Sequence, residues 1–165
     1  MNDSQSLFLE LLDRHYGRWR AIARAYAKDD ADDLFQEIIL QIWQSLPTFR
    51  GDSQSGTWCY RVALNTAMTW RRDLETRRKR LPIAVAIEEI ASRTSDTKND
   101  GAAMLQSLMA KLSPADRGIL MMTLDELTYA EMAAVVGCSE GALRVRVHRI
   151  KQQLADFAKE VRDDV

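Results

Sequence analysis

The apolar residues in the first half of the chain recur at intervals of three and four, the spacing that lines one face of a helix. One stripe covers residues 7–26, and a second covers residues 34–46, where Pro47 ends the periodicity. A polar loop over residues 48–56 precedes a third stripe over about residues 57–80. The pattern predicts three helices packed around one apolar seam.

The second half of the chain carries the start and stop signals of short helices. Ser113 is a candidate N-cap, and Thr128 and Glu131 have the spacing of a capping box. Gly137 suits the left-handed position at a helix end, and a last helix is expected over residues 140–159. Two helices joined by a short turn with a glycine predict a helix-turn-helix.

Between the two halves the periodicity weakens. Leu81 and Pro82 end the third helix, and a run rich in Ser, Thr, Asp and Asn follows. We expect a flexible linker over residues 81–103, and a coil of ~20 residues has a root-mean-square span of about 25 Å. The fold class is therefore predicted to be all-α, with two small helical domains over residues 1–80 and 104–165.

Composition narrows the class of protein. The chain has 165 residues, of which 46% are hydrophobic and 28% charged, as in ordinary globular proteins. No apolar run reaches the roughly 18 residues of a membrane helix, so we expect no membrane insertion and a cytoplasmic location. The two cysteines, Cys59 and Cys138, give neither a disulfide framework nor the paired spacing of a zinc site.

The net charge of −1 hides a strong segregation of charge. Residues 51–80 sum to +4 and residues 139–151 to +3, and acidic sequence flanks each stretch. Two separate contacts with an anionic partner are predicted. For either stretch alone, a solvated helix face is the alternative interpretation.

The second basic stretch belongs to the last predicted helix. Its inward stripe is Leu143, Val147, Ile150 and Leu154, and arginines on the other faces suit bidentate contacts with guanine or phosphate. In a helix-turn-helix, this second helix enters the DNA major groove. The alternative is an amphipathic helix whose cations only keep it soluble.

The third predicted helix interleaves aromatic residues with arginines, a combination that suits single-stranded nucleic acid. Trp58, Tyr60 and Trp70 alternate with basic residues there, although tryptophans at helical spacing more often belong to a core. Asn65 can hydrogen-bond a base edge or serve in helix packing.

The polar face of the second helix gathers carboxylates and amides that can engage arginines of a partner helix, or only keep the face soluble. Catalysis by a carboxylate pair is discounted because no His or Lys lies nearby to separate their pKa values. No glycine-rich phosphate loop, nucleophile elbow or metal-ligand pair appears, so no catalytic residue, metal or cofactor is expected. Two rivals remain: a dimeric helix-turn-helix regulator, and a thiol enzyme using Cys59 or Cys138, for which the pattern offers no partnered His.

Four segments of the chain together resemble bacterial extracytoplasmic-function sigma factors. They are DDLFQE (32–37), FRGDS (49–53), TWCYRVALNTA (57–67) and the closing helix (141–154). The resemblance covers nearly the whole chain and includes the order of its parts. It implies sigma region 2 over residues 1–80, a linker in place of the middle domain of larger sigma factors, and the region 4 helix-turn-helix over residues 104–165.

The resemblance also implies function and partners. The chain is expected to bind core RNA polymerase, to direct it to promoter DNA as duplex and as melted non-template strand, and to be held inactive by an anti-sigma factor. It would be nucleoid-associated when active, or tethered to the membrane through the anti-sigma factor. The enzyme activity would belong to the polymerase.

Site residues follow from the same resemblance, position by position. The polymerase-binding candidates are Asp32, Asp33, Gln36 and Glu37. The candidates for the minus-ten element are Phe49, Arg50, Asp52, Ser53, Asn65, Arg71 and Arg72. The candidates for the minus-thirty-five element are Arg144, Arg146, His148, Arg149 and Lys151.

Two departures from the family pattern stand out. Relatives commonly carry Gly-Thr-Val and a Ser in the recognition helix, where this chain has Gly141, Ala142, Leu143 and Val145. Hydroxyl contacts to phosphate or base are therefore missing, and the promoter sequence cannot be copied from relatives. The segment over residues 123–127 is shorter and more acidic than usual, which disfavours DNA contact by the following helix.

Overall fold

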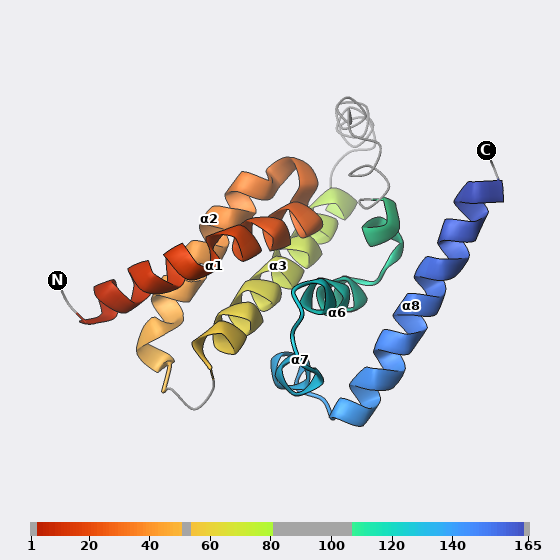
Figure 1. Ribbon diagram of the computed structural model, residues 1–165. Coiled ribbons are helices and arrows are strands. Elements are labelled where there is room, and N and C mark those ends of the chain that lie inside the picture. The colour runs from red at the N-terminus through yellow and green to blue at the C-terminus, as the bar shows by residue number, and fades with distance from the viewer. Residues whose placement is uncertain (1–2, 51–53, 81–106, 164–165) are drawn as a thin grey trace.

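The computed structural model describes residues 3–50, 54–80 and 107–163, and all regular elements in these ranges are helices. The expected all-α class is confirmed. Figure 1 shows two groups of helices side by side, with the linker region outside the described residues. The elements are α1 (Asp3–Ala27), η1 (Lys28–Asp30), α2 (Ala31–Ser45), η2 (Leu46–Thr48), α3 (Ser55–Arg80), α6 (Pro114–Leu124), α7 (Tyr129–Val136) and α8 (Glu140–Asp163).

Helices α1, α2 and α3 pack against one another as the bundle that the three apolar stripes predict. Trp19, Ile38 and Cys59, one from each helix, are at most 1% exposed. Helix α3 begins at Ser55, two residues before the predicted start. Burial of one stripe from each helix leaves polar side chains on the other faces.

The second group of helices confirms the local signals read from the sequence. Ser113 accepts a hydrogen bond from the Asp116 amide at the start of α6, and Thr128 and Glu131 form both bonds of a capping box at the start of α7. Gly137 adopts the left-handed conformation, with φ of 77°, at the end of α7. Helix α8 extends past the predicted end, to Asp163.

The two groups of helices touch each other. Helix α6 packs on α1 and α3, α7 packs on α3, and α8 lies on the far side of α6 and α7 (Figure 1). Gly118 allows the close approach of α6, because a Cβ atom there would meet the Tyr26 hydroxyl at 3.1 Å and both methyl groups of Leu64 at 3.3 Å. The sequence predicted the two groups but not this contact between them.

His15 is a core residue, and its Nε2 atom has no hydrogen-bond partner among the described residues. Its ring lies against Gly56 at the start of α3, where a Cβ atom would meet Cε1 at 3.3 Å. Burial, together with the charges of Arg18 and Arg14, lowers the pKa of His15 below its ordinary value. The folded protein therefore holds a neutral imidazole here.

A lowered folded-state pKa means that the unfolded chain binds a proton near pH 6.5 that the folded chain does not. Stability should therefore be full above about pH 6.5 and should fall by up to about 1 kcal/mol by pH 5.5. We expect His15→Gln to flatten this slope in urea unfolding at pH 7 and pH 5.5. The chain has one other histidine, the exposed His148, and His148→Gln should keep the slope. A slope that follows His148 would contradict the assignment.

Candidate nucleic-acid and polymerase interfaces

The acid-and-amide face of α2 points away from the bundle. Asp33 and Gln36 are exposed, whereas Asp32 forms an ion pair with Arg20 of α1, and Glu37 accepts a hydrogen bond of 2.8 Å from Gln41. The four candidates therefore share one helix, with two of them already engaged within the molecule.

Apolar side chains continue this face toward the end of α2. Leu40 is 45% exposed, and Trp43 is 40% exposed although it packs edge-on against Phe8 at 5.1 Å between ring centroids. Trp43 falls in the apolar stripe predicted over residues 34–46, yet its ring lies at the edge of the core, and the sequence analysis does not single out Leu40. The signal for Leu40 was its position between two buried isoleucines, Ile38 and Ile42, where the helical period turns it outward.

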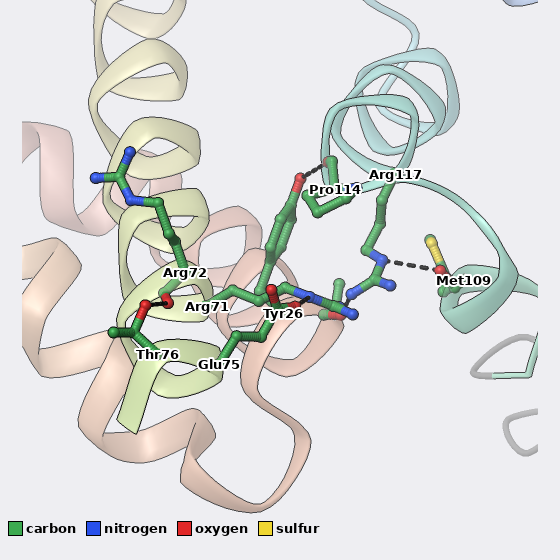
Figure 2. Close-up of polar contacts among 9 residues, drawn as sticks. Tyr26, Arg71, Arg72, Glu75, Thr76, Met109, Pro114 and Arg117 are labelled. Carbon is green, nitrogen blue, oxygen red and sulfur yellow. Dashed lines mark hydrogen bonds and ion pairs between the residues drawn. The ribbon is translucent and has the colours of Figure 1, made fainter. Parts of the chain in front are cut away.

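The candidates for the minus-ten element separate into two groups. Asn65 and Arg72 are exposed and lie seven residues apart on α3, which places them on one face two turns apart. Arg71 instead turns toward α6 and pairs with Glu75 at 3.2 Å, as Figure 2 shows. It also lines a cavity between the two helix groups. The structure does not bring Arg71 to the face that holds Asn65.

The loop before α3 is described only at its two ends. Phe49 stacks at a tilt on Trp58 with 5.0 Å between ring centroids, and Arg50 is exposed. Asp52 and Ser53 lie outside the described residues. Trp58 and Trp70 are partly buried against the core, which supports the core interpretation of both tryptophans.

Helix α8 buries the predicted inward stripe, with Leu143, Val147 and Ile150 at most 3% exposed. The basic candidates lie around the rest of the helix: His148, Arg149 and Lys151 are exposed. Arg144 is also exposed; its guanidinium lies 4.3 Å from the centroid of the Tyr129 ring and 3.6 Å from Glu140.

Arg146 differs from the other cations of α8 because its guanidinium pairs with Asp116 of α6 at 2.6 Å. Burial alone would raise the pKa of Asp116, but hydrogen bonds from Ser113 and Arg146 and the charges of Arg146 and Arg149 hold it below its ordinary value. Arg146 therefore ties the last helix to the first helix of this group.

Val145 lies on the outer face of α8 and is 61% exposed. Sequence reasoning noted it only as a departure from the family pattern. An exposed methyl-bearing side chain on a recognition helix can contact the methyl group of thymine. Val145 lies four residues after Gly141 and three before His148, which places the three residues on one helix face. This spacing was the signal that could have identified Val145 as a residue of the outer face.

Both halves of the chain are similar to known proteins. The sigma-70 region 2 family matches residues 11–78, and the sigma-70 region 4 family matches residues 102–154. The ECF RNA polymerase sigma-E factor of Escherichia coli K12 is 30% identical over 148 residues, which cover 81% of this chain and 76% of that protein. The chain belongs to the ECF RNA polymerase sigma factors. The sigma-E factor of Haemophilus influenzae is 26% identical over the same length.

Two solved structures have the same fold. The structure of CnrH in complex with the cytosolic domain of CnrY has a TM-score of 0.68, 25% identity, and coverage of 94% of this chain and 90% of that chain. The sigma factor RpoE of Bartonella quintana, in complex with the anti-sigma factor NepR, has a TM-score of 0.72 at 19% identity, over 92% of this chain and 96% of that chain. As a sigma factor, the protein acts in transcription initiation.

Two further findings bear on the rival classes. Cys59 is 1% exposed, and burial raises the pKa of its thiol to about 12, so it is a poor nucleophile. Cys138 is exposed and free. Within the described ranges, no group of three or more His, Cys, Asp or Glu residues could hold a metal, and no helix is long and apolar enough to cross a membrane.

The different environments of Arg146 and Arg149 lead to a testable difference. Arg146→Ala removes the ion pair with Asp116 and should lower the free energy of unfolding by about 0.5–1 kcal/mol, a value reduced by partial solvent screening. Arg149→Ala should leave stability within about 0.5 kcal/mol and weaken binding to duplex promoter DNA by about 1–3 kcal/mol. Urea unfolding and DNA titration of both variants check this. Equal stability of the two variants would contradict the structural role of Arg146.

Proposed function

We propose that this sigma factor uses three separate surfaces, one for core RNA polymerase, one for the melted minus-ten element and one for the duplex minus-thirty-five element. The observation that carries the proposal is that α2, α3 and α8 each bury an apolar stripe and expose most of the polar residues singled out on them by the family resemblance, with Glu37, Arg71 and Arg146 as the less exposed members. The family matches over residues 11–78 and 102–154 support the division into domains at 1–80 and 104–165, joined by a linker at 81–103.

The α2 face is the proposed polymerase contact. Asp33 and Gln36 present a carboxylate and an amide to arginines of a partner helix. Asp32 and Glu37 lie beside them on the same helix. Leu40 adds the apolar area that a specific interface needs near its centre.

Asn65 and Arg72, with Phe49 and Arg50 at the loop, form the proposed minus-ten surface; Asp52 and Ser53 complete that loop in the sequence. Melting becomes favourable when a protein holds unpaired bases better than the duplex does, at a cost of a few kcal/mol for each extruded base. Because Arg71 is engaged beside α6, its contact with DNA would require the two helix groups to separate.

The α8 helix is the proposed reader of the minus-thirty-five element. Arg144, His148, Arg149 and Lys151 supply donors for bases and phosphates, and Val145 supplies an apolar contact. Arg146 contributes through its pair with Asp116, which fixes the helix in position.

An anti-sigma factor is the proposed regulator, as two structurally similar proteins were solved with an anti-sigma factor or a partner's cytosolic domain. A cavity of about 550 Å³ lies between the helix groups, with apolar walls that include Met121 and Leu124 and with Arg24, Lys28 and Arg71 at its lining. Such a lining fits an amphipathic acidic segment. We propose a cytoplasmic protein, nucleoid-associated when active and tethered to the membrane only through such a partner, with no catalysis of its own.

Reversal of charge on the polymerase face tests the proposal. Asp33→Arg should weaken binding to purified core polymerase at least about tenfold, because a like charge facing arginines costs several kcal/mol. Transcription from a cognate promoter in a purified system should fall in parallel, while the circular-dichroism spectrum stays unchanged.

Asp13→Arg is the matched control, since it reverses an exposed carboxylate on the neighbouring helix α1. It should bind core polymerase as the unmodified protein does. Normal binding by Asp33→Arg, or the same loss in both variants, would refute the assignment of the α2 face.

A further inference from the structure

In the acidic turn between α6 and α7, the carboxylate of Asp125 contacts both α1 and α3 of the other helix group. Asp125 Oδ2 accepts a hydrogen bond of 2.8 Å from the hydroxyl of Tyr60 on α3 and pairs with Arg18 Nε of α1 at 3.1 Å. The Arg18 guanidinium also lies 5.6 Å from the centroid of the Tyr60 ring. Burial and the neighbouring Asp125 carboxylate raise the pKa of Tyr60, so the phenol remains a donor.

Other polar contacts reinforce this junction along α6 and α7. The Tyr26 hydroxyl donates to the Pro114 carbonyl at 2.5 Å, and Arg117, which is 3% exposed, donates to the Ala25 carbonyl at 2.9 Å (Figure 2). Arg61 of α3 donates to a backbone carbonyl in α7. Side chains of both groups thus bond across the junction.

This closed arrangement cannot serve both promoter elements at once. A compact chain of this length is about 40 Å across, by the scaling of the radius of gyration. Elements named for positions minus ten and minus thirty-five are separated by about 85 Å of duplex at 3.4 Å for each base pair. Residues 81–106 could span on the order of 85 Å if fully extended, so the chain permits the separation that the DNA requires.

We infer that Asp125 is the latch of a closed, self-inhibited form of this sigma factor. The inference rests on the proposed function, because it requires that α3 and α8 bind separate promoter elements. When only a fraction of the protein is in the binding-competent form, the apparent affinity for DNA is reduced in proportion to that fraction. Core polymerase and promoter, which bind the open form, would shift the chain toward it.

The latch also accounts for the acidic character of the segment over residues 123–127, which the family resemblance left without a role. Asp125 uses its carboxylate across the junction, whereas Glu126 beside it is exposed. No hydrogen bond or ion pair of the Glu126 side chain occurs in the described part of the chain. The two acids carry the same charge, so a comparison of substitutions at the two positions distinguishes the loss of a specific bond from a general effect of charge.

The test measures energy transfer between dyes on Cys138 and on Asp13→Cys in the full-length protein. Cys138 is exposed and Cys59 is 1% exposed, so the two intended thiols react selectively. We expect Asp125→Ala to lower the transfer efficiency and to shift the closed-to-open ratio about tenfold, as expected for the loss of a charge-assisted hydrogen bond. At limiting protein, transcription in the purified system should rise.

Glu126→Ala is the control and should keep the efficiency of the parent protein. Gly118→Leu is a second, independent opening variant, because the nearest atoms to its new side chain belong to Tyr26 and Leu64 of the other helix group. Leucine also has a higher helix propensity than glycine, so α6 should still form and the variant should fold.

The inference is overturned if Asp125→Ala and the parent protein give the same efficiency, or if Glu126→Ala lowers it equally. It is supported if Asp125→Ala and Gly118→Leu both lower the efficiency while Glu126→Ala does not. The energy-transfer measurement needs no polymerase, so an absence of transcription by the parent protein would count against the proposed function and not against the latch.

Discussion

The seating of α6 against α1 and α3 determines how the two halves of this sigma factor are related. Gly118 brings the backbone of α6 close to Tyr26 and Leu64, and the buried Arg117 donates to carbonyls of Ala25 and Met109. A charged group that is 3% exposed is tolerated only when hydrogen bonds replace its water. These bonds depend on the position of α1, so the placement of α7 and α8 follows from the packing of the first bundle.

The junction between the helix groups has two opposite effects on the closed arrangement: one stabilises it, and the other lowers the cost of opening it. Its packing buries apolar residues of both halves in one cluster, which stabilises the closed arrangement. Its polar contacts, centred on Asp125, exchange readily for bonds to water or to a partner, which makes opening less costly than the separation of a purely apolar interface. If the proposed function holds, binding two separate promoter elements requires such a balance between the closed and open forms that we infer.

Local signals in the sequence were sufficient for the helices and their ends. The caps at Ser113 and Thr128 and the left-handed Gly137 depend on residues at most three or four apart, and the structure confirms them. Asp125 and Tyr60 are 65 residues apart, and Asp116 and Arg146 are 30 apart, so no local pattern links them. The exposed face of each helix was predictable from periodicity, but not which of its cations the protein uses for its own packing, as the cases of Arg71 and Arg146 demonstrate.

A covalent lock tests most directly whether this sigma factor must open to work. Arg61 donates to the Ala134 carbonyl across the junction, so Arg61→Cys with Ala134→Cys, in a Cys138→Ser background, places two thiols there for a short reducible bis-thiosulfonate cross-linker. The account predicts that the cross-linked protein fails to initiate transcription with core polymerase, that reduction restores initiation, and that either single-cysteine variant is unaffected by the reagent. Normal initiation by the cross-linked protein would contradict it.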